Sequence, residues 1–145
     1  MNKFYLAHSR SDQEEVREIE LRIEKDLSID LINPFWDIDY PLRWDRRTNE
    51  DGTFRELTDD ERRQIVEVEK RVIQETDGLV VLILKGNTLI GLSMEVHYAF
   101  ENLHKSVFIY AQTQDIFNHP WLRMHSTFIT DNLGKLIMKL QEVSD

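Results

Sequence analysis

The stretch Gly78–Leu84 most constrains what this chain can fold into. Its sequence, Gly-Leu-Val-Val-Leu-Ile-Leu, is an unbroken apolar run of strand length that contains β-branched residues. A strand without alternating polar residues is buried on both faces, and such strands are typical of parallel sheets covered by helices on both sides. The run therefore predicts a central strand of an α/β domain.

Strand and helix patterns alternate along the rest of the chain. Four further strands are predicted at Lys3–Ala7, Ile29–Ile32, Lys105–Tyr110 and Ser126–Ile129. Helices are predicted at about 11–27, 58–75 and 91–103 and from Asp131 onward, the first two opening with capping boxes, Ser11 with Glu14 and Thr58 with Glu61. This order predicts one domain over residues 1–145 with a flavodoxin-like, doubly wound parallel sheet of about five strands.

Two segments lack a regular period. Residues 111–121 are expected to form a polar loop, and about 33–57 a longer irregular loop that contains Trp36, Asp37 and Trp44. A loop of this length in a small domain is commonly functional. Its tryptophans fit a flap that stacks on a flat base, and they fit equally well as anchors onto the core.

Composition excludes several classes of function. The 145 residues carry a formal net charge of −9, which argues against a nucleic-acid partner because phosphate backbones are bound by clustered Lys and Arg. The chain has no cysteine, its five histidines show no metal-ligand spacing, and no cofactor is implied. No run approaches the roughly 18 apolar residues that span a membrane. We expect a cytoplasmic protein without a membrane partner.

Glu95 is the first candidate for chemistry. In the predicted helix that follows the central strand, Leu92, Val96 and Ala99 recur at helical spacing, and Glu95 falls at the edge of this apolar face. We expect it in the first turn, where the helix dipole favours an ionised carboxylate and where α/β sheets bind ligands. Acidic residues are also common in first turns for dipole reasons alone.

Glu69 is the second candidate. It lies four residues after Ile65 and four before Ile73, so it points from the middle of the apolar face of its predicted helix. A glutamate in such a position is either paired by a basic group or backbone amide, or it is at work in a site.

The segment Gly91-Leu92-Ser93-Met94-Glu95-Val96-His97-Tyr98-Ala99 resembles the active-site motif of nucleoside 2-deoxyribosyltransferases, Gly-x-Gly-x-Glu-x-Gly-Tyr-Ala. The resemblance implies that Glu95 is the nucleophile that takes the deoxyribosyl group. Ser93 and His97 stand where the family has glycines. The family also has an aspartate eight residues before the Asp that opens the strand, and Glu69 stands eight before Asp77.

The same resemblance implies the substrate-binding residues. The first strand–turn–helix corner lines the substrate site in this family, and related nucleotide N-glycosidases hold a 5′-phosphate there. Ser9, Arg10 and Ser11 could hold an anion, although Ser11 is also explained as a helix cap. Many members have a base-contacting aspartate just before the motif, where this chain has 87–90, Asn-Thr-Leu-Ile. The predicted substrate-binding set is Tyr5, Ala7, His8, Ser9, Arg10, Trp36, Asp37, Gly91, Ser93 and Met94.

Three functions remain open on the sequence. The resemblance implies cleavage of the N-glycosidic bond of a nucleoside or nucleotide, with transfer to another base or to water. A TIR-like domain that cleaves or binds NAD-type nucleotides has a similar fold and a catalytic glutamate. A non-catalytic member of the fold would bind only a nucleotide or a protein.

We also expect a homodimer or a higher homo-oligomer. Met94, Tyr98 and Asn102 share a helix face turned away from the apolar stripe, and Met and Tyr are frequent at interfaces. The resemblance implies a neighbour that completes each site. Alternatively, Met94 and Tyr98 pack under the long loop of their own chain.

Overall fold

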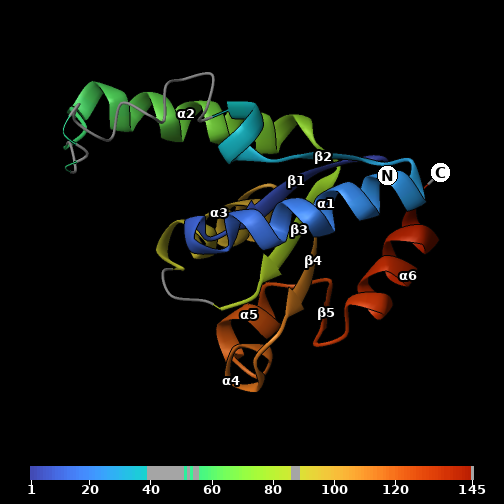
Figure 1. Ribbon diagram of the computed structural model, residues 1–145. Coiled ribbons are helices and arrows are strands. Elements are labelled where there is room, and N and C mark those ends of the chain that lie inside the picture. Colours follow the sequence, from blue (N-terminus) through green and yellow to red (C-terminus); the bar gives the residue numbers. More distant parts are fainter. Residues whose placement is uncertain (39–50, 52, 54–55, 86–88, 145) are drawn as a thin grey trace.

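The centre of the computed structural model is a parallel sheet of five strands in the order β2-β1-β3-β4-β5 (Figure 1). The structure describes residues 1–38, 51, 53, 56–85 and 89–144. The strands are β1 (Lys3–His8), β2 (Asp30–Ile32), β3 (Gly78–Ile83), β4 (Ser106–Ala111) and β5 (Phe128–Thr130). All neighbouring strands are parallel, which confirms the predicted flavodoxin-like sheet.

Strand β3 lies in the middle, and all six of its residues are buried. Its side chains alternate between two apolar clusters, because successive residues of a strand point to opposite faces. Leu79 and Val81 join the cluster beneath α2 (Asp59–Glu75), α3 (Ile90–His97) and α5 (Pro120–Met124). Val80 and Leu82 join the cluster beneath α1 (Gln13–Leu27) and α6 (Leu133–Val143). Figure 1 shows α1 in front of the sheet and α3 behind it.

The start of α2 agrees with the capping box predicted from the sequence. The backbone N–H of Glu61 donates to Thr58 Oγ1 at 3.2 Å, and the N–H of Thr58 donates to Glu61 Oε1 at 3.0 Å. The predicted capping box is therefore present. The amino-terminal half of this long helix extends past the sheet (Figure 1).

The capping box predicted at the start of α1 is wrong. A 3₁₀ turn at Arg10–Asp12 comes first, α1 begins at Gln13, and no side chain caps it. The Ser11 hydroxyl instead lies 3.0 Å from that of Ser9. The carboxylate of Asp12, which is 2% exposed, accepts the backbone N–H groups of Leu84 and Lys85 at 3.2 and 3.3 Å. This contact ties the start of α1 to the end of β3.

The predicted polar loop at 111–121 is also wrong, because it contains α4 (Gln114–Phe117) and the start of α5. Pro120 opens α5, and His119 caps it by accepting the N–H of Trp121 on Nδ1. Helices of four or five residues are too short to show a hydrophobic period.

Across the part of the chain that the structure describes, no helix combines the length and the apolar character that crossing a membrane requires.

We predict that Gly78→Ala destabilises the protein. A Cβ atom at this position would lie 2.5 Å from the backbone oxygen of Ser106 on β4, so the sheet would have to shift. Overpacking of this kind costs about 1–3 kcal/mol in the free energy of unfolding, measurable by urea titration.

Gly91→Ala is the matched control. A Cβ atom there meets nothing within 4 Å. Because alanine favours a helix over glycine, we expect equal stability or a gain of up to about 1 kcal/mol. If Gly78→Ala were as stable as the parent, there would be room for a Cβ atom between residue 78 and the backbone of Ser106.

Candidate functional site

A groove of about 540 Å³ runs between α2 and α3 on one side of the sheet. Glu69 from α2 and Glu95 from α3 both line it. The two glutamates singled out from the sequence are thus brought into one cavity. The full lining consists of Val66, Glu69, Lys70, Ile73, Gly91, Ser93, Met94, Glu95, His97, Tyr98 and Asn102.

Glu95 is held by the helix that follows β3. Leu92, Val96 and Ala99 are buried on the sheet, which leaves Glu95 on the flank of α3 that faces the groove. The side chain is half-buried, and its Oε2 atom is shielded from solvent.

The expected place of Glu95 in the first helical turn is wrong. Helix α3 begins at Ile90, no acidic residue lies in its first turn, and Glu95 follows in the second. The helix continues as a π-helical segment, Tyr98–Asn102, in which the N–H of Leu103 donates to the Tyr98 oxygen.

Glu69 is half-buried on the inner side of α2. Its neighbour along the same helix face, Ile73, is 1% exposed and belongs to the core, with Val72 and Val68 packed beside it. The core contact of these three residues turns Glu69 toward α3. The helical periodicity of the sequence predicted that Glu69 lies on the apolar face of its helix, and its partial burial agrees with this.

Contacts between α2 and the π-helical segment that continues α3 join the two walls of the groove. Gln74 Nε2 donates to the Tyr98 hydroxyl at 2.7 Å, and Lys70 Nζ lies 5.2 Å from the centre of the Tyr98 ring. Tyr98, which was predicted to lie on an oligomer interface, contacts α2 of its own chain and stays partly exposed. Lys70 was missed, although its spacing from Gln74 places both on one helix face.

Three of the predicted substrate-binding residues also line the groove. Gly91, Ser93 and Met94 are exposed along α3, and Met94 has 69% of its surface accessible.

The predicted site residues of the first strand and of the turn after it are not among the residues that line the groove. Tyr5 and Ala7 are fully buried in the core cluster beneath α2 and α3, so they support the groove from below. His8 and Ser9 are buried and Arg10 is exposed, and none of the three lines the groove. Tyr5 and Ala7 of this corner thus share a core cluster with Leu92 and Val96 of α3 and with Ile73 of α2.

His8 belongs to a buried polar network. Its Nδ1 lies 2.9 Å from the Ser9 carbonyl oxygen, and its Nε2 lies 3.0 Å from Asn33 Oδ1. Asn33 Nδ2 donates to Glu20 Oε2 at 2.9 Å, and Arg17 donates to Glu20 Oε1 at 2.8 Å. Because Asn33 is fully buried, these bonds fix the carboxyl ends of β1 and β2.

Burial shifts the pKa values of two groups of this network in opposite directions. Burial lowers the pKa of His8, and hydrogen bonds to Asn33 and Ser9 oppose this shift. Burial raises the pKa of Glu20, against hydrogen bonds from Asn33 and Arg17. The sequence analysis missed Glu20, although it lies four residues after Val16 on the apolar side of α1.

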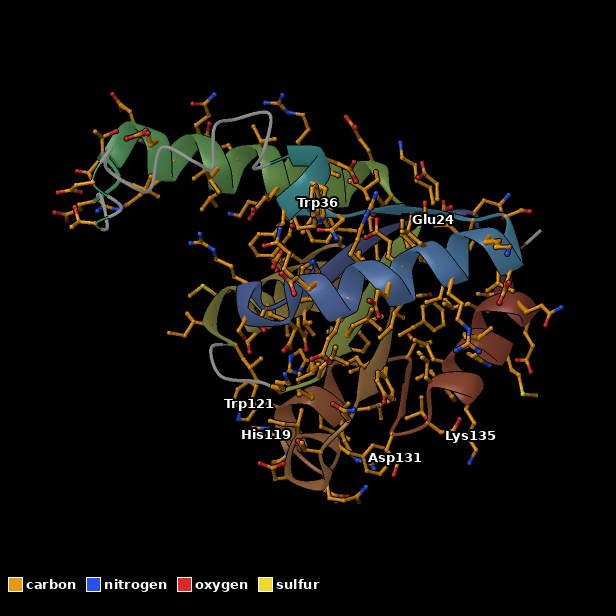
Figure 2. All side chains as sticks on the ribbon, viewed as in Figure 1. Glu24, Trp36, His119, Trp121, Asp131 and Lys135 are labelled. Atoms are coloured by element: carbon orange, nitrogen blue, oxygen red, sulfur yellow. The ribbon has the colours of Figure 1, made fainter. Side chains whose placement is uncertain are left out.

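Trp36 and Asp37 lie in a π-helical segment, Pro34–Ile38. Asp37 Oδ2 accepts the backbone N–H of Asn33 at 2.8 Å, which is a structural contact. Trp36 is 42% exposed, and the Arg17 guanidinium lies 5.4 Å from its ring, so Trp36 sits against α1 (Figure 2). The rest of the predicted loop, including Trp44, mostly falls outside the described residues, as do residues 86–88 before α3.

The turn after β1 contains two groups of opposite charge, the exposed Arg10 and the buried carboxylate of Asp12. The hydroxyls of Ser9 and Ser11 contact each other. Binding of an anion at this turn stays a prediction.

No group of three or more His, Asp or Glu side chains within residues 1–38, 51, 53, 56–85 and 89–144 is arranged to hold a metal ion.

The fold and the groove define a flavodoxin-like α/β protein with two carboxylates in one cavity. Among solved structures, the chain is similar to a 2-deoxyribosyltransferase from the psychrotolerant bacterium Bacillus psychrosaccharolyticus, described as a biocatalyst for nucleoside synthesis. The two share 16% identity and a TM-score of 0.65 over 98% of this chain and 92% of that one. This similarity shows a common fold. Comparison with protein-family models and with curated protein sequences finds no match.

The buried network predicts a pH effect on stability. His8 in the unfolded chain binds a proton near its ordinary pKa of 6.5, whereas the lowered pKa keeps the folded form neutral to lower pH. The free energy of unfolding should therefore decrease as the pH falls from about 7.5 to about 5.5. Glu20 has the opposite effect on stability, at pH values nearer its ordinary pKa of 4.5. Because its pKa is raised in the folded form, the folded form binds the proton before the unfolded form does as the pH falls, and this stabilises the folded form.

Thermal unfolding of the parent and of His8→Gln across this range tests the effect. We expect a smaller decrease for the variant, since glutamine does not titrate. His104→Asn is the control, because His104 is exposed and its φ of 53° is one that asparagine tolerates. If His8→Gln kept the full pH dependence of the parent, burial of His8 would not be its source.

Proposed function

We propose that this protein cleaves the N-glycosidic bond of a nucleoside and transfers the sugar to another base or to water. One observation carries the proposal: Glu69 and Glu95 line the same groove, in a chain that shares its fold with a 2-deoxyribosyltransferase. A cavity of this size suits a small molecule rather than a macromolecule.

The reaction follows from the two carboxylates. A Glu95 oxygen bonds to the anomeric carbon as the bond from that carbon to the base nitrogen breaks. The electron pair of the broken bond stays on the base, which takes up a proton. A nitrogen of a second base, or water, then attacks the anomeric carbon of the Glu95 sugar ester and gives its proton to Glu69, which had lost its own to the leaving base. The Glu95 carboxylate is released.

Glu69 has the second role in this scheme. As a carboxylate it orients the sugar hydroxyls and stabilises the positive charge that develops on the ring; as a carboxylic acid it protonates the leaving base. Tyr98 and Lys70 hold the opposite walls at a fixed distance, and the missing side chain at Gly91 lets a ligand approach the α3 backbone.

The charges favour a nucleoside over its 5′-monophosphate. Among the described residues of the groove, Glu69 and Glu95 outnumber the one ammonium group, that of Lys70. A phosphate would therefore be repelled in the groove.

We further propose that the protein works as a homo-oligomer. Ile90 and Met94 on α3 are 71% and 69% exposed, and Val66 on α2 is 49% exposed, so apolar side chains border the groove. A second copy packed on this border would cover the groove and exclude water from it.

Glu95→Ala should abolish base release, with a loss of at least about a thousandfold, because it removes the atom that forms the covalent bond. The side chain is only half-buried, so the far-ultraviolet circular dichroism and the unfolding midpoint should stay near those of the parent. The assay follows free base by chromatography, using deoxynucleosides, their 5′-monophosphates and NAD as substrates. Full activity of the variant would refute the proposal, and base released from NAD alone would favour the TIR-like alternative.

Glu69→Gln should lower turnover by roughly a hundredfold or more while the melting temperature changes little. Glu67→Gln is the matched control, since Glu67 is an exposed glutamate two residues away on the same helix. A purely structural Glu69 would give the reverse result, a lower melting temperature with turnover retained, because a partner group would be left uncompensated.

A further inference from the structure

A second cavity lies on the other flank of α3. It has a volume of about 260 Å³ and is bounded by α3, α4 and α5, beyond the carboxyl ends of β3 and β4. Ser93 and His97 line both this cavity and the groove that contains Glu95, so α3 separates the two. The proposed reaction uses nothing in this second cavity.

The lining is mostly apolar and aromatic. Its floor is aliphatic, and its sides carry an indole, three imidazoles and a hydroxyl. No carboxylate, ammonium or guanidinium group occurs among the described residues that line it. The full lining is Leu89, Ser93, Val96, His97, Ile116, His119, Trp121, Leu122 and His125.

Trp121 is exposed and yet held in place. It is 68% accessible, and its ring stacks on His125 at a centroid distance of 5.6 Å and an interplanar angle of 16°. His125 is 9% exposed and fixed at both nitrogens: Nδ1 donates to the Trp121 carbonyl oxygen at 2.7 Å, and Nε2 lies 3.2 Å from Glu101 Oε1. The indole is therefore a preorganised aromatic surface beside the cavity.

His119 supplies a hydrogen-bond donor. Its Nδ1 accepts the backbone N–H of Trp121 at 3.3 Å, so the proton of the neutral ring is on Nε2. Figure 2 shows His119 and Trp121 next to each other at α5. A planar aromatic surface, an apolar floor and a few neutral polar groups are the features that bind flat heteroaromatic rings.

We propose that this cavity is a second ligand site, distinct from the groove, that binds an uncharged planar heteroaromatic ring of the size of a free nucleobase. The ring stacks on Trp121, and His119 and Ser93 bond to its polar edge. The described lining residues include no ammonium or guanidinium group that would pair with a phosphate or carboxylate of a ligand. This site goes beyond the proposed function and does not depend on it, because its test involves no turnover.

The test uses the methyl resonance of Ile116, which lines this cavity and not the groove. Adenine, hypoxanthine and cytosine are titrated separately into the full-length protein, and the shift of this resonance gives each Kd. We expect a saturable shift with at least one base. Trp121→Ala should weaken that binding by about tenfold or more, the size of effect that loss of one base–aromatic stack produces.

Two further variants sharpen the result. Trp121→Phe keeps an aromatic face and should bind within a few-fold of the parent. Met138→Ala, which removes an exposed apolar side chain from α6, should bind as the parent does. The proposal is wrong if the Ile116 resonance does not shift with any base, or if Trp121→Ala binds as tightly as the parent.

A protein partner is the competing occupant, because Met124 on the same helix is also 70% exposed. Sedimentation velocity of the parent and of Trp121→Ala decides this point. Dissociation of an oligomer by this substitution, together with an unshifted Ile116 resonance, would identify the face as an interface between copies and overturn the proposal.

Discussion

The burial of β3 on both faces is the constraint on which the rest of the structure depends. Leu79 and Val81 face one helical layer, and Val80 and Leu82 face the other, so the strand is stable only when both layers are in place. The next helix along the chain after this strand is α3. The position of Glu95 is therefore a consequence of how the centre of the sheet is covered.

Most of the fold was predictable because its signals are local and repeated: apolar strands, helical periodicity and one capping box. The same capping motif was right at Thr58 and wrong at Ser11, and the difference is tertiary. At Thr58 the helix start is exposed, so the local bonds form. At Ser11 the neighbouring Asp12 is drawn into the core by backbone N–H groups of a distant strand, and the turn adopts another shape.

The candidate site was partly predictable for the same reason. Glu69 stood out because a charged residue interrupts an apolar helix face, whereas Lys70, Gln74 and Tyr98 act through a contact between two helices that no single segment reveals. The first corner was expected at the substrate by resemblance alone. In the structure His8 forms hydrogen bonds with a carbonyl and an amide, and the Asn33 partner lies 25 residues away, so no local pattern reveals this network.

The contact of Asp12 with Leu84 and Lys85 has a consequence for the order of folding. It joins groups 72 and 73 residues apart, and the entropy of closing so long a loop must be overcome before the bond forms. A nascent chain that has emerged only as far as β2 has no partner for this carboxylate. The tie between the start of α1 and the end of β3 is therefore a long-range contact that can form only after the chain as far as Lys85 is available.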